Sequence, residues 1–315
     1  MALNKAKKIS LRVIRGSSVV INMAILAGIL IMMTFSVYAM WDSDQIYRSA
    51  DATRYDIYRP KAGETASFEE FQAENPEVIA WLMVYGTNID YPITQGTNNL
   101  KYVTTDAFGN YALSGAIFLD YRNDKTFADF NSILYGHHMN RDTMFGELST
   151  FEDKVFFDER VYGNLFYEGV DYGLEFFAFI DDVDAYDRSI FTVNVKGQEQ
   201  KQQYLDNLLA NAVNIRNIGV MTSDRLLVLS TCDAAMTNGR DLLIARITDE
   251  TYADPFEEER IISVIDRLIS LPMWARILIP VVLLILIILV ICTKNKKSNK
   301  NKKEGKKDDE GSHAK

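Results

Sequence analysis

Apolar residues follow two contrasting patterns along this 315-residue chain. An uncharged apolar run covers 17–40, and a second, mostly apolar run covers 271–292. Between them lie short runs rich in Val, Ile, Leu, Phe and Tyr, separated by turn residues such as Gly, Asn and Pro. Long apolar runs predict membrane helices, whereas short punctuated runs predict β-strands. The pattern therefore predicts a β-rich domain between two membrane segments.

Eight strands and few helices are expected in the middle region, which predicts a mainly β fold built as a closed or nearly closed eight-stranded barrel. A helix is predicted over 198–212, and another is predicted to begin at Ser67, where Ser67 and Glu70 would form a capping box. Phe68 and Phe71 would then face the core. The predicted strands cover 79–84, 89–93, 115–119, 132–135, 174–181, 191–195, 226–230 and 242–247.

Basic residues flank both apolar runs on their outer sides. Five precede the first run with no acid among them, and a lysine-rich tail follows the second. The positive-inside rule then places both termini in the cytoplasm and the middle region outside the cell, on a two-pass membrane protein. A cleaved signal peptide ending near Val37–Ala39 is the alternative for the first run, which is long for a signal sequence.

The expected organisation follows from these boundaries. The seven segments are a cytoplasmic tail (1–16), an anchor (17–40), a stalk or N-terminal helical segment (41–66), a β-barrel domain (67–249), a juxtamembrane linker (250–270), a second membrane helix (271–292) and a charged cytoplasmic tail (293–315). The external region 41–270 carries 39 acidic and 19 basic residues, a net charge near −20. This charge argues against nucleic acid as a partner and against docking on anionic lipid.

Cys232 is the most informative single residue. It ends the segment Leu226–Cys232, LLVLSTC, in which a buried strand would deliver a thiol to the rim of a sheet. The other cysteine of the chain, Cys292, ends the second apolar run, and a membrane between them would keep the two thiols apart. A lone cysteine is either a buried structural residue or a nucleophile.

Two histidines and an arginine accompany this thiol. His137 and His138 follow a predicted strand and Gly136, and Arg240 lies eight residues after Cys232, across a short predicted hairpin turn. The alternatives are two solvated imidazoles and a solvated arginine, with Arg246 as a rival for the arginine role. An imidazole can ionise a thiol and later protonate a leaving amine, and a guanidinium can stabilise an oxyanion. The residue types thus favour a Cys–His acyl-transfer site, with no cofactor or metal expected.

The motifs YGHHM and LSTC, followed by an arginine after a short loop, resemble those of sortases. The flanking segments SFEEFQAENPEVIAWLMVYGTNIDYPITQG, GAIFLDYRND and NSILYGHHMNRDTMFGELSTF resemble class B in particular, over roughly 67–248. The resemblance implies a membrane-anchored cysteine transpeptidase of Gram-positive bacteria. In it, Cys232 would be the nucleophile, His137 rather than His138 the acid and base, and Arg240 the residue that holds the substrate and the oxyanion.

The same resemblance implies the substrates. Surface proteins with an LPXTG-like C-terminal sorting signal would be cleaved after the Thr, through a thioester, and passed to an amine. That amine would belong either to the peptidoglycan precursor lipid II or to a pilin lysine. The substrate contacts it suggests are Ser230, Thr231, Asn99 and Tyr186.

One feature departs from the class B pattern. Class B enzymes usually carry one N-terminal anchor, whereas a second, C-terminal membrane segment is typical of the pilus-building class C, whose lid motif is not evident in 41–66. Two other functions remain open: a membrane-tethered β-domain that only binds peptides, and a hydrolytic protease with the same Cys–His pair.

Overall fold

The computed structural model of the protein describes residues 2–61, 63, 65–232, 239–257 and 281. The strands in these ranges are β1 (Val78–Val84), β2 (Asp90–Thr94), β3 (Ile117–Leu119), β4 (Asn131–Gly136), β5 (His138–Met139), β6 (Thr143–Met144), β7 (Tyr162–Tyr167), β8 (Val170–Asp184), β9 (Asn214–Ile215), β10 (Arg225–Cys232) and β11 (Gly239–Thr248). The helices are α1 (Ala2–Ala50), α2 (Ala66–Glu74), α3 (Lys154–Glu159) and α4 (Gln198–Asn211), with 3-10 helices η1 (Ala52–Tyr58), η2 (Lys101–Val103) and η3 (Leu148–Glu152).

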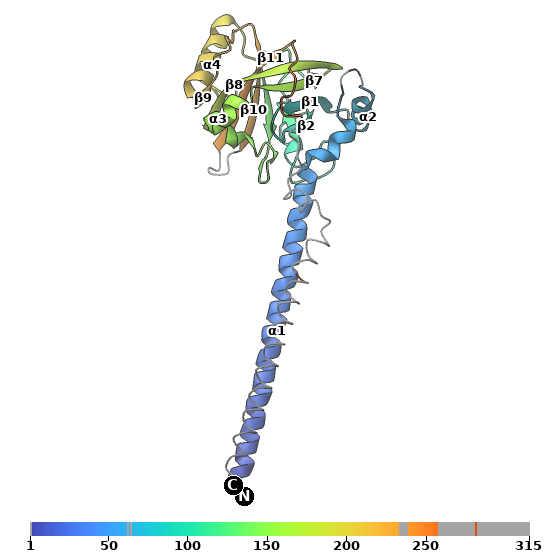
Figure 1. Ribbon diagram of the computed structural model, residues 1–315, viewed down its shortest axis with the longest axis vertical. Coiled ribbons are helices and arrows are strands. Elements are labelled where there is room, and N and C mark those ends of the chain that lie inside the picture. Colours follow the sequence, from blue (N-terminus) through green and yellow to red (C-terminus); the bar gives the residue numbers. More distant parts are fainter. Residues whose placement is uncertain (1, 62, 64, 233–238, 258–280, 282–315) are drawn as a thin grey trace, which may run out of the picture. The chain divides into compact units, whose positions relative to one another are not determined.

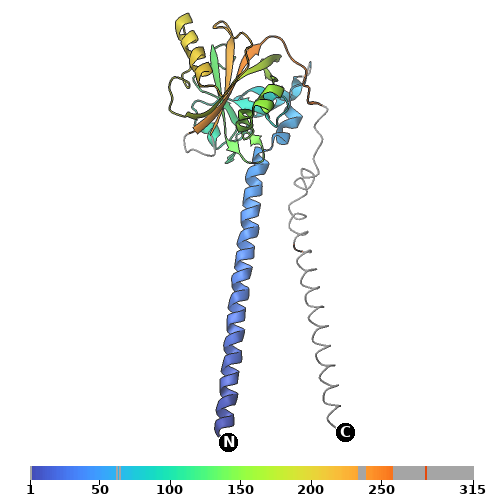
Figure 2. The ribbon, with the colours of Figure 1, turned by 60° about the vertical axis from the view of Figure 1, so that its left-hand side comes forward.

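Eight of the strands close into a barrel, as predicted (Figures 1 and 2). Their order is β11-β10-β4-β3-β2-β1-β7-β8, and pairing of β8 with β11 completes the ring. The pairs β10–β4 and β2–β3 are parallel, and the other pairs in the ring are antiparallel. β9 adds to β8, and β5 with β6 forms a separate two-stranded ribbon. Closure matters because it leaves the ring itself without an open edge.

The predicted strands omit the short β5, β6 and β9, and they differ from the strands of the ring at two further places. The segment 191–195 is irregular, and its backbone carbonyls are bonded by side chains, since Asn131 donates to the carbonyl of Thr192. Its apolar residues still alternate and pack on the barrel, so the period of two was present without a partner strand. The missed strand is β7, whose sequence YGNLFY mixes polar and aromatic residues.

The helices were predicted more closely. The helix expected over 198–212 is α4, which lies on the outside of the barrel in Figures 1 and 2. The capping box was wrong, because α2 begins at Ala66 and the Ser67 hydroxyl donates instead to the carbonyl of Arg59 at 3.4 Å. Phe68 and Phe71 are buried as expected.

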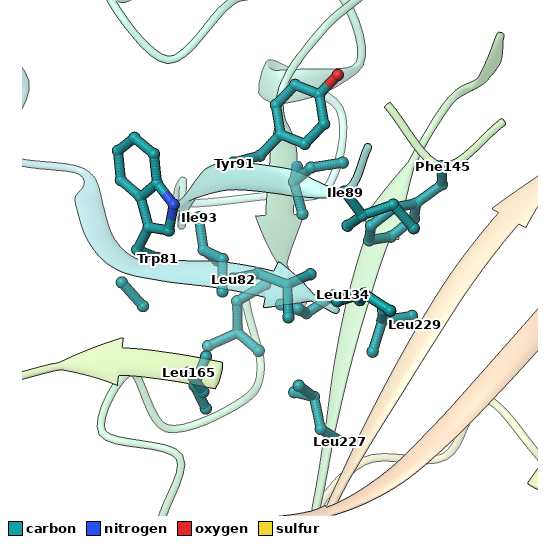
Figure 3. Close-up of a cluster of buried hydrophobic side chains, with 14 of the residues drawn as sticks. Trp81, Leu82, Ile89, Tyr91, Ile93, Leu134, Phe145, Leu165, Leu227 and Leu229 are labelled. Carbon is teal, nitrogen blue, oxygen red and sulfur yellow. The ribbon is translucent and has the colours of Figure 1, made fainter. Parts of the chain in front are cut away.

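Two apolar clusters lie on opposite faces of the β4–β10–β11 strands. The inner cluster fills the barrel and contains Leu227 and Leu229 (Figure 3). The outer cluster contains Leu226 and Val228 and is covered by α4 and 191–195. Because side chains alternate along a strand, each residue of β10 belongs to one of these two faces.

The helix α1 contains the first apolar run. Its large apolar side chains between Ile21 and Met40 are exposed, and within the described residues it is the one helix long and apolar enough to cross a membrane. It continues to Ala50 and η1 follows at Ala52, so much of the expected stalk is helical. The second predicted membrane helix, 271–292, apart from residue 281, lies outside the described residues, as do Cys292 and the tail 293–315.

Candidate active site

Three neighbouring strands bring the predicted catalytic residues to one edge of the barrel. In the parallel β4–β10 pair, Thr231 lies opposite Gly136, and His137 follows directly. In the antiparallel β10–β11 pair, Cys232 lies opposite Arg240. The predicted hairpin register is thus confirmed, and the backbone places the three residues at adjacent strand ends.

Strand alternation separates Ser230 from Thr231. Ser230 is in phase with Val228 on the outer face, as is position 232, whereas Thr231 is in phase with Leu227 and Leu229 of the inner cluster. Both hydroxyls are buried and have no hydrogen-bond partner among the described residues.

The imidazole of His137 is held by the backbone. Its Nε2 lies 2.8 Å from the carbonyl oxygen of Val103, at the end of η2. Since a carbonyl only accepts, Nε2 carries the hydrogen in this bond. The neutral ring then keeps its lone pair on Nδ1, where a proton can be taken up or released.

The neighbouring His138 has a different environment. It belongs to the β5–β6 ribbon, where it pairs with Met144. Its Nδ1 is buried and has no hydrogen-bond partner among the residues described. The two adjacent imidazoles are therefore not equivalent, and His137 has the ring bond that orients it.

Gly136 places His137 through close packing. A Cβ at this position would lie 2.5 Å from Cδ1 of Ile117 and 2.7 Å from Cδ2 of Phe145, which is closer than real Cβ atoms approach. Its φ does not lie in the left-handed region, so the backbone conformation itself does not require a glycine here. The inner cluster instead packs tightly against the end of β4.

A buried carboxylate organises the wall beside the site. Asp120 accepts hydrogen bonds from the Arg122 side chain at 2.7 and 2.8 Å, from Asn99 at 2.9 Å and from the Tyr135 hydroxyl at 3.2 Å. Burial opposes its charge, but the hydrogen bonds from Arg122 and Asn99 and the charge of Arg122 hold the pKa of Asp120 below its usual value. Asn99 also accepts from the backbone N–H of Tyr121, so both ends of its amide are engaged.

Tyr135 connects this wall to Arg240. Its ring stacks on Phe191 at 6.4 Å between centroids. Burial and the charge of Asp120 raise the pKa of Tyr135, while the charges of Arg122 and Arg240 partly offset this shift. The charge of Arg240 therefore acts on the Tyr135 hydroxyl. The net shift still raises the pKa, so the hydroxyl stays protonated.

The remaining predicted residues lie at the rim or away from it. Tyr186 is exposed, in the loop that follows β8, and its backbone N–H donates to Asp184, which pairs with Gly239. Arg246 lies further along β11, where it is ion-paired with Glu175 and lies 3.7 Å from Asp224.

Comparisons with known proteins identify the family. No family model matches the chain. Sortase B of Staphylococcus aureus (strain NCTC 8325 / PS 47) is 30% identical over 184 residues, which cover 57% of this chain and 74% of that protein. The chain belongs to the class B sortases. The resemblance found in its motifs is thereby confirmed.

Two solved class B sortases are similar over the barrel. The sortase B from the type II pilus of Streptococcus pneumoniae is 45% identical, with a TM-score of 0.52, over 58% of this chain and 99% of that one. A Streptococcus pyogenes class B sortase involved in pilus biogenesis is 39% identical, with a TM-score of 0.53, over 59% of this chain and 100% of that one.

Sequence reasoning missed the supporting residues of this sortase. Val103, Asp120, Arg122 and Tyr135 were not singled out, although they hold His137 and form the wall near Arg240. A signal was available for Asp120, since an aspartate directly after the apolar strand at Ile117–Leu119 is a buried charge that needs partners. Nothing in the sequence marks a backbone carbonyl such as that of Val103.

Proposed function

We propose that this class B sortase is a cysteine transpeptidase with Cys232 as nucleophile, His137 as general acid and base, and Arg240 as the group that holds the substrate carbonyl. The observation that carries the proposal is the strand register. With Thr231 opposite Gly136 and Cys232 opposite Arg240, the end of β4, which precedes His137, lies beside the β10–β11 hairpin although these segments are far apart in the sequence.

The reaction proceeds in two acyl-transfer steps. The Cys232 thiolate attacks the Thr carbonyl of an LPXTG-like motif, and the oxyanion is stabilised by Arg240. The C–N bond then breaks, the leaving amine takes a proton from His137, and a thioester remains. An incoming amine attacks the thioester and gives its proton to His137. The thiolate is regenerated as the new amide bond forms.

The substrate contacts divide into two kinds. Ser230 lies on the same face as position 232, and its hydroxyl has no hydrogen-bond partner within the described part of the chain. Tyr186 is exposed near Gly239, so both residues are proposed to touch the sorting peptide. Asn99 is engaged with Asp120 and Tyr121, and Thr231 lies on the inner face. These two residues are proposed to hold the backbone at the rim of the site in place.

The acceptor is proposed to be either a cell-wall amine of lipid II or the lysine of a pilin. Of the two solved relatives described above, one comes from a type II pilus and the other is involved in pilus biogenesis, and both are more similar in sequence to this chain than the Staphylococcus aureus sortase B is. This supports the pilin lysine as a second candidate acceptor. Purified pilin subunits with an intact sorting signal would form ladders if the lysine is used, whereas a cross-bridge peptide would give a single adduct.

The proposed location is the cell membrane, with the catalytic domain 67–249 and its linker outside and both termini cytoplasmic. The exposed apolar side chains of α1 and the basic residues that precede its apolar run support this arrangement. Protease added to intact protoplasts should digest the middle region and protect both tails. A cleaved C-terminal tail would overturn the two-pass topology.

The decisive experiment incubates the full chain with a panel of LPXTG-like peptides, with and without an amine, and follows the products by mass spectrometry. We expect a thioester adduct on Cys232, amide product when amine is present, and neither from Cys232→Ala. Product released only by water would make the protein a protease. Peptide binding without any adduct would make it a binding domain.

A further inference from the structure

The hydroxyl of Tyr91 joins the end of the anchor helix to the segment that contains His137. Tyr91 lies on β2 and its ring is buried, while Figure 3 shows its hydroxyl directed away from the apolar cluster. The hydroxyl donates to the carbonyl of Ala50 at 2.9 Å and accepts the backbone N–H of Met144 at 2.9 Å. One side chain thus bonds two backbones that are far apart in the sequence.

Met144 is close to the proposed catalytic histidine. It pairs with His138 in the β5–β6 ribbon, and the next backbone N–H, that of Phe145, donates to the carbonyl of His137 at 3.1 Å. The side chain of Phe145 packs beneath Gly136. Tyr91 therefore holds the Met144–Phe145 backbone, which in turn bonds the backbone of His137.

The segment between the two histidines and Phe145 needs such restraint. Arg141, Asp142 and Met144 all have φ between 53° and 65°, the left-handed region that is unfavourable for residues other than glycine. Strained residues of this kind persist when surrounding contacts over-determine them. Two contacts link this segment to the anchor helix. The first is the Tyr91 hydroxyl, which bonds both Met144 and Ala50. In the second, Cζ of Arg141 lies 4.1 Å from the centre of the Tyr47 ring.

The anchor helix gains from the same bridge. The last carbonyls of a helix have no partner within it. The carbonyl of Ala50, the last residue of α1, accepts from Tyr91, and that of Ser49 accepts from Arg54 at 2.8 Å. The Ser49 and Ser114 hydroxyls are also hydrogen-bonded at 2.8 Å. The barrel therefore caps the end of α1 while α1 restrains the histidine segment.

We propose that Tyr91 is a positioning residue that couples the anchor helix α1 to His137. By holding Met144, it keeps the 137–145 backbone in the conformation that places the imidazole against the carbonyl of Val103. This inference rests on the proposed catalytic role of His137. It makes the end of α1 part of the active-site support in addition to its role as a tether.

The test compares Tyr91→Phe with Tyr85→Phe in the full chain, reconstituted in lipid nanodiscs. Tyr85 is a matched control, since its hydroxyl also bonds a backbone carbonyl, that of Tyr252 at 3.0 Å, and it belongs to no part of the proposed site. Measurements are kcat and KM with an LPXTG-like peptide and an amine, and hydrogen exchange of the Met144 and Phe145 amides. Tyr91→Phe should lower kcat by about 10-fold or more with little change in KM, as expected for a misplaced catalytic group. Both amides should exchange faster, whereas Tyr85→Phe should change neither quantity.

A second variant keeps the test valid if Tyr91→Phe does not fold. Tyr47→Leu removes the ring under Arg141 from the half-buried surface of α1 and should shift kcat and exchange in the same direction, by less. Unchanged exchange at Met144 in Tyr91→Phe, or equal loss of kcat in Tyr85→Phe, overturns the coupling. His137→Ala could keep full turnover while Tyr91→Phe still speeds exchange of the Met144 and Phe145 amides. The proposed catalytic role of His137 would then be wrong, whereas the restraint of this segment by Tyr91 would be supported.

Discussion

The Nε2 atom of His137 lies 2.8 Å from the carbonyl oxygen of Val103. This contact determines the tautomer of the neutral ring and leaves its lone pair on Nδ1. It also links the end of η2 to the end of β4, two segments that strand pairing does not connect directly. The orientation of the imidazole therefore depends on a loop as well as on the barrel.

His137 and His138 should differ sharply when replaced. We expect His137→Ala to lower kcat about 10²–10⁴-fold, because one proton-transfer group contributes that much. His138→Ala should cost much less, since that ring belongs to the β5–β6 ribbon. Steady-state kinetics with a sorting peptide and an amine provide the measurement. Equal losses, or the reverse order, would remove His137 from its proposed role.

Arg240 and Arg246 form a second matched pair on the same strand. Removal of an oxyanion-type donor costs about 10²–10³-fold in turnover, so Arg240→Ala should be nearly inactive. Arg240→Lys should also be strongly impaired, because lysine keeps the charge but loses the planar fork. Arg246→Lys should be mild, since Arg246 is engaged with Glu175 and Asp224. Alkylation of Cys232 by a small thiol reagent should persist in the Arg240 variants. A dispensable Arg240 with an essential Arg246 would refute the assignment.

Gly136→Ala should impair both stability and turnover. The added Cβ would meet Ile117 and Phe145 at 2.5 and 2.7 Å, and overpacking of this kind costs about 1–3 kcal/mol in the free energy of unfolding. His137 follows directly and should be displaced, so kcat should fall as well. Gly96→Ala is the control, because its nearest contacts are ordinary, at 3.4 Å or more. Denaturant unfolding and kcat report the two effects, and wild-type values of both in Gly136→Ala would contradict the packing argument.

Glu147 should make stability depend on pH near neutrality. Its carboxylate accepts the N–H of Asn88 at 2.8 Å, while burial and the charge of Asp142 raise the pKa of Glu147 to about 7. A raised carboxyl pKa favours the protonated form in the folded state. The stability it contributes is present below the unfolded pKa of about 4.3 and is lost as pH rises towards 7.

Replacement of Glu147 by glutamine should remove that loss. Glu147→Gln should have a higher Tm than the wild type at pH 8, and the difference should shrink towards pH 5, because the amide can still accept from Asn88 but never ionises. Thermal unfolding across this range is the measurement. The exposed Glu152→Gln is the control and should show no such trend. A difference of constant size at all pH values would contradict the prediction.

The barrel could be predicted from the chain because its strands are short apolar runs separated by turn residues. The continuous apolar runs at 226–230 and 242–247 located β10 and β11, and the spacing of eight residues from Cys232 to Arg240 indicated their register. The prediction failed at 191–195, where alternating apolar residues pack on the outer cluster without a partner strand. Alternation reports burial of one face, and strand pairing needs a neighbour that only the fold supplies.

By itself, the sequence determined the membrane-type apolar runs, the β-rich domain and the candidates for the reactive side chains. Each of these depends on residue types and on spacing along the chain, which local physics can interpret. The tertiary structure alone decided that Val103 holds His137, that Asp120 gathers Arg122, Asn99 and Tyr135, and that Tyr91 bonds Ala50 to Met144. Apart from Asp120–Arg122, these contacts join residues that are distant in sequence, several through backbone atoms that every residue has. A local pattern could mark Asp120 as a buried charge, but it could not name the distant partners.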